Sequence, residues 1–166
     1  MNACKETDAS VDAATFRSAL GRFVTGVTVM TARAADGRLA GMTASSFNTL
    51  SLDPPLILWS IALKSPSLEV FRAAGRFAVN ILAQDQQALA RQFSRAAPNK
   101  FAGVEIHDGL CGVPLVAGAV AHLQCELAAR YPGGDHEILI GRVVRARAEN
   151  ARAPLVYCRG RFGCFV

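Results

Sequence analysis

The residues best suited to bind a ligand lie in one stretch, residues 41–55, between two apolar runs. Six of them are Thr, Ser or Asn, which bring hydroxyls, an amide and accessible backbone N–H groups without bulk. Asp53-Pro54-Pro55 restricts the chain to extended geometry, because each Pro constrains itself and the residue before it. Such a rigid polar rim suits a ligand rich in hydrogen-bond acceptors, such as a phosphorylated heterocycle. An ordinary Ser/Thr-rich loop would show the same residues, so on chemistry alone both interpretations stand.

A second candidate for chemistry is the tripeptide Gly134-Asp135-His136. A histidine beside an aspartate is a candidate catalytic pair. Pro132-Gly133-Gly134-Asp135 is also what an ordinary hairpin turn would use. From the residues alone, the tripeptide fits both a turn and a catalytic site.

The five cysteines and three histidines show no metal-binding pattern. The cysteines are odd in number and contain no Cys-x-x-Cys pair, and no histidine falls at a metal-ligand spacing from them. Reduced, mostly structural thiols are expected, and no metal site. The cysteines are Cys4, Cys111, Cys125, Cys158 and Cys164, and the histidines are His107, His122 and His136.

The formal net charge of +5 raises the question of a nucleic-acid partner. Six of the 18 basic residues fall late in the chain, yet neither aromatic interleaving nor a recognition-helix pattern accompanies them. We interpret them as solvated strand faces with a mild attraction for anionic small molecules. These six residues are Arg142, Arg145, Arg147, Arg152, Arg159 and Arg161.

Length and composition predict a single globular domain over residues 1–166. Hydrophobic residues make up 51%, enough to form a folded core rather than a disordered chain. The longest apolar run, residues 56–63, is too short to cross a bilayer. The first residues are charged and carry no apolar signal core, so we expect a cytoplasmic protein with residues 1–11 as a flexible N-terminus.

Hydrophobic periodicity predicts the elements that must position these residues. A helix is expected over residues 12–22, with Asp12 as its N-cap. Alternation over residues 27–31 predicts a strand, Asp36-Gly37 a hairpin turn, and residues 39–47 the partner strand. The polar rim is then the end of a hairpin strand and the loop after it. The expected apolar face of the helix consists of Phe16, Ala19, Leu20 and Phe23.

The pattern of the remaining residues also predicts mainly strands. One further helix is predicted from Ser65, as N-cap, to Ala74, and another over residues 84–94. Residues 95–117 are predicted to be irregular because Gly and Pro interrupt them. Six or so strands, mostly joined as a meander with short helices between them, predict a mainly β fold built as a small closed barrel. The later strands are expected at 55–63, 77–82, 119–130, 136–147 and 154–157.

Four segments of the chain, in this order, resemble the flavin reductase family of the FMN-binding split-barrel fold. The family includes the reductase components of two-component flavin monooxygenases. The resemblance covers about residues 14–163. It implies a mainly β split barrel, Greek-key-like, with short flanking α-helices. The segments are Thr25-Gly26-Val27, residues 41–47 with 51–55, Gly134-Asp135-His136, and residues 154–157 followed by Arg159-Gly160.

The resemblance also implies a flavin site on the polar rim. Fixed backbone N–H donors there would hold the flavin ring and tune it. Lys64 and Ser65 would bind a phosphate with an ammonium group and the start of a helix. The rim residues implied at the ring and ribityl chain are Thr43, Ala44, Ser45, Ser46 and Phe47, with Asn48 and Thr49 continuing towards the phosphate. The other cofactor-binding residues implied are Thr25, Gly26, Val27, Tyr157 and Arg159.

For catalysis, the resemblance implies roles for the two polar residues of the tripeptide. Hydride transfer needs close, stacked rings rather than a protein base. His136 would therefore position the nicotinamide, and Asp135 would orient the imidazole.

The function implied is an NAD(P)H:flavin oxidoreductase that uses FMN or FAD with NADH or NADPH and passes reduced flavin to a partner monooxygenase. A homodimer is also implied, with no nucleic-acid or membrane partner. The alternative is a non-catalytic flavin- or haem-binding protein on the same barrel. A nucleic-acid-binding barrel fits less well, because exposed aromatics on one sheet face are lacking. The choice between FMN and FAD, and between NADH and NADPH, stays open, as does the partner.

Overall fold

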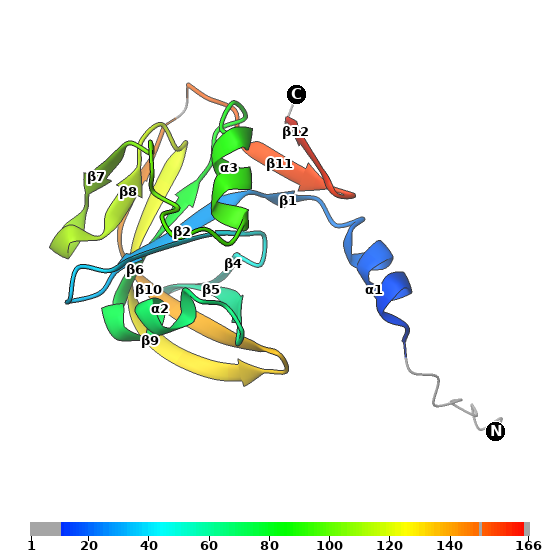
Figure 1. Cartoon of the computed structure of the whole chain (residues 1–166), viewed down its shortest axis with the longest axis horizontal. Coiled ribbons are helices and arrows are strands. Elements are labelled where there is room, and N and C mark those ends of the chain that lie inside the picture. Colours follow the sequence, from blue (N-terminus) through cyan, green and yellow to red (C-terminus); the bar gives the residue numbers. More distant parts are fainter. Residues whose placement is uncertain (1–10, 150, 165–166) are drawn as a thin grey trace.

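In the computed structural model, which describes residues 11–149 and 151–164, the chain is mainly β, with three α-helices and twelve strands among those residues (Figure 1). The predicted mainly β fold is confirmed, but the expected number of strands was too low. None of the described helices is long and apolar enough to span a bilayer. The expected flexible N-terminus falls on residues 1–10, outside the described residues, and on residue 11. The helices are α1 (Ala13–Leu20), α2 (Leu68–Ala74) and α3 (Gln87–Ser94).

Seven strands form one antiparallel sheet in the order β3-β2-β6-β9-β10-β5-β4. Its two end strands, β3 and β4, follow each other in the chain, so residues 45–47 connect the two ends of the sheet. A small sheet has the order β1-β11-β12, and β7 pairs with β8. This large sheet with a separate small one agrees with the split barrel that the resemblance implied. The strands are β1 (Thr25–Gly26), β2 (Thr28–Arg33), β3 (Leu39–Ala44), β4 (Asn48–Leu52), β5 (Pro55–Ala62), β6 (Arg76–Ile81), β7 (Ile106–Asp108), β8 (Pro114–Val116), β9 (Ala121–Gly133), β10 (His136–Ala148), β11 (Leu155–Cys158) and β12 (Arg161–Cys164).

The main core lies between the large sheet and α2. Along β5, alternate residues Ile57, Trp59 and Ile61 are buried, as the period of two in a half-buried strand requires. The Trp59 ring packs edge-on against Phe71 of α2, with ring centroids 4.9 Å apart. The predicted buried strand over residues 55–63 is therefore present, one residue shorter than expected.

A second core cluster fixes α3 against the sheet. Phe93 of α3 is fully buried and packs in one cluster with Val29, Leu82 and Leu155. Gly41 of β3 has no room for a side chain, since a Cβ atom there would collide with the Phe93 ring. The close approach that Gly41 allows brings α3 to the end of β3, where the polar rim begins.

Helix α1 forms as predicted but does not pack on its own chain. Asp12 caps it, and its carboxylate accepts hydrogen bonds from the N–H groups of Ala14 and Thr15 at 2.9 and 3.0 Å. No residue of α1 is buried, and Phe16 and Leu20 are 55% and 57% exposed. Figure 1 shows α1 standing away from the rest of the molecule. The apolar face that the sequence predicted exists, but it faces solvent in a single chain.

Helix α2 begins at Leu68, three residues after the predicted N-cap Ser65. The N–H of Leu68 donates to the Ser65 carbonyl at 3.1 Å, so residues 65–68 form a turn with Pro66 at its second position. Proline suits that position of a turn and the first position of a helix equally well, which explains the wrong start. The helix ends as predicted at Gly75, whose φ of +64° is left-handed.

Two stretches predicted to lack regular structure contain strands. Residues 48–52, expected to belong to the rim loop, form the edge strand β4 paired with β5. Residues 95–117, expected to be irregular, contain β7, a 3₁₀ turn at Leu110–Gly112, and β8. These strands are short, and their residues carry few of the β-branched and aromatic side chains that make a strand visible in a sequence.

Candidate functional site

Three parts of the chain that are far apart in sequence meet around one cavity of about 350 Å³. They are the β2–β3 hairpin end, helix α3 and the β11–β12 hairpin. Five of the residues that the sequence analysis assigned to a flavin site line this cavity: Val27, Thr43, Ala44, Ser45 and Tyr157. The other residues that line it are Ala90, Arg91, Ser94, Arg95, Gly160 and Phe162.

Side-chain hydrogen bonds fix the end of β3 at this cavity. The Thr28 hydroxyl donates to the Ala44 carbonyl at 2.7 Å, across the β2–β3 ladder. The Thr43 hydroxyl donates to the Ala90 carbonyl of α3, also at 2.7 Å. Ser45 follows directly, so its position is set on one side by a sheet strand and on the other by a helix. The Thr43 hydroxyl is used for this anchoring, which leaves the exposed Ser45 hydroxyl available to a ligand.

The small sheet brings a buried hydroxyl and two aromatic rings to the same region. Thr25 of β1 pairs with Tyr157 of β11. The Thr25 hydroxyl oxygen is buried and has no hydrogen-bond partner among the described residues. Tyr157 packs against Phe162 with ring centroids 5.3 Å apart. A buried polar atom without a partner needs an explanation, and a ligand hydrogen bond supplies one.

Helix α3 contributes residues that the sequence analysis did not single out. Arg91 of α3 and Arg95, the C-cap residue directly after it, are exposed and line the cavity. The Arg91 guanidinium carbon lies 5.1 Å from the centroid of the Phe162 ring, a cation–π arrangement. Arg95 is the C-cap residue beyond the last helical residue, so no helical spacing in the sequence marked the two arginines as a pair.

The predicted catalytic pair lies at the tip of the β9–β10 hairpin. Gly134 has a φ of +68°, the left-handed conformation that this turn requires. The Nδ1 atom of His136 is 2.6 Å from the Oδ1 atom of Asp135. The hydrogen bond to His136 and the charge of its ring lower the pKa of Asp135, and Lys64 adds to the effect. Asp135 is therefore an ionised acceptor that orients the imidazole and leaves Nε2 free for a substrate.

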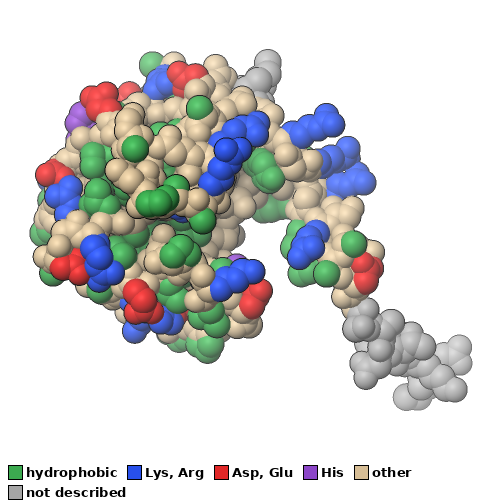
Figure 2. Space-filling view, in the orientation of Figure 1, with side chains coloured by type: hydrophobic (Ala, Val, Ile, Leu, Met, Phe, Trp, Pro, Cys, Tyr) green, Lys and Arg blue, Asp and Glu red, His purple; other side chains and the backbone are tan. Residues whose placement is uncertain are grey.

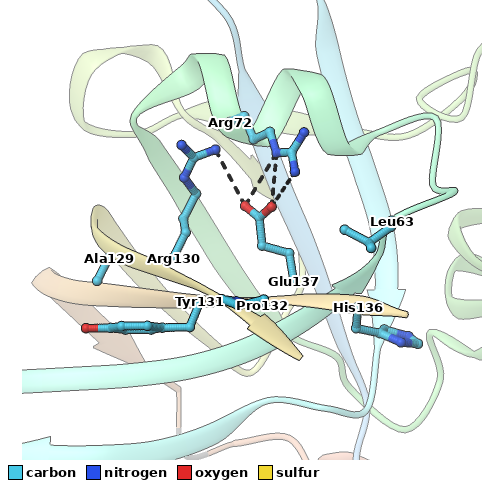
Figure 3. A pocket seen from close by; sticks show the side chains of 8 residues that line it. All are labelled: Leu63, Arg72, Ala129, Arg130, Tyr131, Pro132, His136 and Glu137. Carbon is cyan, nitrogen blue, oxygen red and sulfur yellow. Dashed lines mark hydrogen bonds and ion pairs between the residues drawn. The ribbon is translucent and has the colours of Figure 1, made fainter. Parts of the chain in front are cut away.

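Below this hairpin lies a larger cavity of about 810 Å³, shown in Figure 3. The Glu137 carboxylate is largely buried and accepts hydrogen bonds from Arg72 of α2, while Arg130 of β9 lies 3.5 Å away. The hydrogen bond from Arg72 is the main reason why the pKa of Glu137 is lowered. Figure 3 shows Glu137 pointing towards both arginines and away from His136. These ion pairs join α2, β9 and β10, and so hold the hairpin that carries His136.

Strand β5 connects the polar rim with the His136 hairpin. The Ser46 hydroxyl is 3.1 Å from both the N–H and the carbonyl oxygen of Ser60 in β5. Two residues further along, Ala62 pairs with His136 of β10. The polar rim and the predicted catalytic pair therefore adjoin the same strand. The Ser46 hydroxyl, like that of Thr43, holds the backbone in place.

The helix start predicted at Ser65, which was expected to help bind a phosphate, is wrong, because α2 begins at Leu68. Lys64 and Ser65 do not line the 350 Å³ cavity and instead follow β5 on the His136 side. The charge of Lys64 reaches Asp135, and the N–H of Leu63 donates to the Asp135 carbonyl at 2.9 Å. If Lys64 contacts an anion, it does so next to the catalytic pair rather than at a helix N-terminus.

The remaining predicted site residues lie around the cavity rather than on its wall. Phe47 packs against the main core, and Gly26 pairs with Val156 in the small sheet. Asn48 and Thr49 belong to the edge strand β4, where they are exposed. Arg159, with a φ of +49°, lies in the β11–β12 turn and lines a neighbouring cavity.

The chain is similar to proteins of one known family. The sequence profile of the family described as "Flavin reductase like domain" matches residues 20–164. The FMN reductase (NADH) SmoA of Agrobacterium fabrum is 44% identical over 152 residues, which cover 90% of this chain and 84% of that protein. The flavin-dependent monooxygenase reductase subunit HsaB of Rhodococcus jostii is 37% identical over 153 residues, covering 92% of this chain and 78% of that protein.

A solved structure is similar over nearly the whole chain. It is the Streptomyces globisporus NADH:FAD oxidoreductase SgcE6 in complex with NAD and FAD fragments. The TM-score is 0.88 and the sequence identity 37%, and the match covers 95% of this chain and 98% of that one. From the profile match, the two relatives and the shared fold, the chain belongs to the flavin reductase like domain family.

Proposed function

We propose that this protein is an NADH:flavin oxidoreductase that reduces FMN or FAD and supplies reduced flavin to a partner monooxygenase. The observation that carries the proposal is the meeting of Val27, residues 43–45 and Tyr157 around one cavity. The names of similar proteins support it: an NADH-dependent FMN reductase, an NADH:FAD oxidoreductase and the reductase subunit of a flavin-dependent monooxygenase. The first two names also favour NADH over NADPH as the hydride donor.

The residues around the cavity fit a flavin. The buried Thr25 hydroxyl lacks a partner among the described residues and can bond to a ring heteroatom, and the Ser45 hydroxyl is exposed. Val27 and Ala44 supply apolar surface for the ring, and the α3 arginines supply positive charge for the phosphate. When bound, the flavin supplies the hydride acceptor.

In this proposal the protein's own catalytic contribution is positioning. His136 hydrogen-bonds the nicotinamide through Nε2, and Asp135 holds the imidazole through Nδ1. The ion pairs of Glu137 with Arg72 and Arg130 keep the hairpin in place from the other face of β10. No residue has to remove a proton for the hydride to move, so fixed geometry is the main requirement.

A non-catalytic flavin- or haem-binding role is not favoured. The described residues that line the cavity include no His, Cys or Met, which are the usual axial ligands of haem. The similar proteins named above are reductases or reductase subunits.

We expect the purified protein to oxidise NADH only when FMN or FAD is added. The measurement is loss of the near-ultraviolet absorbance of reduced nicotinamide, with and without each flavin. NADPH in place of NADH should give a lower kcat/KM. A protein that binds flavin but oxidises neither nucleotide would contradict the proposal and favour the binding-protein alternative.

The proposal includes a homodimer formed through α1. Burial of a large apolar side chain contributes about 1.5–3 kcal/mol, and α1 with the residues beside it offers several that are exposed. A two-fold symmetric pair is the commonest arrangement for a homo-oligomer. In β4, at the edge of the large sheet, Leu52 is 93% exposed. The exposed apolar residues in and beside α1 are Val11, Phe16, Leu20, Phe23 and Val24.

We expect the double variant Phe16→Asp, Leu20→Asp to be monomeric where the wild type is dimeric. Two carboxylates on the apolar face would have to be buried unpaired in the dimer, which is strongly unfavourable. Light scattering at micromolar protein measures the mass of each. Ser18→Asp, on the same helix, is the control for adding charge. A wild type with the mass of a monomer would overturn the dimer.

We also propose that the protein is a single domain located in the cytoplasm. The family profile spans residues 20–164 without a break. The described thiols Cys111, Cys125 and Cys158 are all free, as is usual for a protein of a reducing compartment.

A further inference from the structure

Arginines without a carboxylate partner gather at one corner of the molecule. Eight of the fifteen arginines pair with a carboxylate, and the other seven have no such partner among the described residues. Six of the seven lie in three places: α3 and its C-cap, the β11–β12 hairpin, and α1 with the residues directly after it. Figure 2 shows basic side chains where the body meets α1. The six are Arg17, Arg22, Arg91, Arg95, Arg159 and Arg161, and the seventh is Arg145 of β10.

Two adjoining cavities connect these arginines with the proposed flavin site. Arg91 and Arg95 line the 350 Å³ cavity, and Arg159 lines the neighbouring one, together with Arg17 and Arg22. Both cavities include Gly160. Neither cavity has an Asp or Glu among the described residues that line it. A concave surface with only positive charge attracts anions.

The same wall carries two aromatic rings in contact, tilted by 58° relative to each other. Tyr157 and Phe162 pack at 5.3 Å, and Arg91 lies over Phe162 at 5.1 Å. Tyr157 remains 37% exposed, so its ring is accessible to a ligand. Nucleobases stack on aromatic rings and on guanidinium planes, while adjacent arginines bind phosphate oxygens.

We infer that Arg91, Arg95, Tyr157 and Phe162 form a binding site for an adenosine diphosphate moiety, the chemical group that FAD and NADH share. The inference rests on the proposed function, and it adds residues of α3 and β12 to the site. The pyrophosphate contacts the two arginines, and the adenine stacks on the aromatic pair. An acidic protein surface fits less well, because the two arginines and the rings line the same cavity as Ser45 of the proposed flavin site.

The first test is direct binding of ADP to the flavin-free protein by calorimetry. The double variant Arg91→Gln, Arg95→Gln should raise the Kd of ADP by at least about tenfold, because charge-assisted hydrogen bonds to phosphate are the strong ones. Arg145→Gln, which removes an arginine without a carboxylate partner from another part of the molecule, should leave the Kd of ADP unchanged. Equal ADP affinity in the double variant and the control would overturn the inference.

The second test identifies the source of the moiety. Riboflavin serves as the hydride acceptor that lacks both phosphate and adenosine. If FAD uses the site, the double variant raises the KM for FAD and leaves those for riboflavin and NADH unchanged. If NADH uses it, the KM for NADH rises with riboflavin as the acceptor. Unchanged KM values for FAD and for NADH would contradict the inference. If the double variant then transferred reduced flavin to a monooxygenase less efficiently, the two arginines would be assigned to docking of the partner protein. If the wild type oxidises no NADH, the proposed function fails, while the ADP titration still decides this inference.

Discussion

Replacing Ser45 by tyrosine is expected to abolish flavin binding, and flavin-dependent NADH oxidation with it. Ser45 lines the 350 Å³ cavity and follows the last residue of β3. The hydrogen bonds of Thr28 to Ala44 and of Thr43 to Ala90 hold the backbone there, so it cannot retreat to make room for a phenol ring. The ring would occupy the space that the flavin needs. Titration with FMN and with FAD, followed by flavin fluorescence, measures the loss.

The control for this variant is Ser45→Ala, which removes the hydroxyl and adds no volume. It should still bind flavin, with a binding free energy weaker by about 0.5–1.5 kcal/mol, because that is the contribution of one neutral hydrogen bond. Both variants should keep the wild-type melting temperature, since Ser45 is exposed and outside the core clusters. If Ser45→Tyr binds flavin with wild-type affinity, the flavin ring binds elsewhere on the protein.

The parts of the fold that sequence predicted well are those where a local pattern has one physical solution. The apolar run of residues 55–63 formed the strand β5, and Asp36-Gly37 formed the turn of the β2–β3 hairpin. The wrong start of α2 has the opposite cause, because Ser65-Pro66 satisfies a turn as well as a helix start. The local sequence does not distinguish a turn from a helix start. In the folded chain, residues 65–68 form the turn that follows β5.

The residues of the candidate site also fall into two groups, those that the sequence indicated and those that it did not. Thr43 to Ser45 were visible in the sequence because they belong to a segment that resembles the flavin reductase family, whereas their chemistry alone also fits an ordinary polar loop. Arg91 and Arg95 were not, because a cation on a surface helix is ordinary until the β11–β12 hairpin, more than sixty residues later, is packed beside it.

His136→Ala should lower the rate of flavin reduction and leave flavin affinity nearly unchanged. His136 is on the β9–β10 hairpin and does not line the 350 Å³ cavity, so its loss leaves the proposed flavin site intact. A lost positioning contact raises the barrier by about 1–3 kcal/mol, roughly a ten- to hundredfold slower reduction. Stopped-flow reduction of prebound flavin by NADH measures the rate, and a flavin titration measures the affinity.

Two further variants separate positioning from a general effect of removing a histidine. His107→Ala, in the exposed strand β7, should reduce flavin at the wild-type rate. Asp135→Asn should lie between wild type and His136→Ala, because the imidazole remains but loses the carboxylate 2.6 Å from its Nδ1 atom. Wild-type reduction rates in His136→Ala would remove His136 from the site. A collapse of flavin affinity in the same variant would instead move His136 from the nicotinamide to the flavin, because only a residue that contacts the flavin lowers its affinity before any hydride moves.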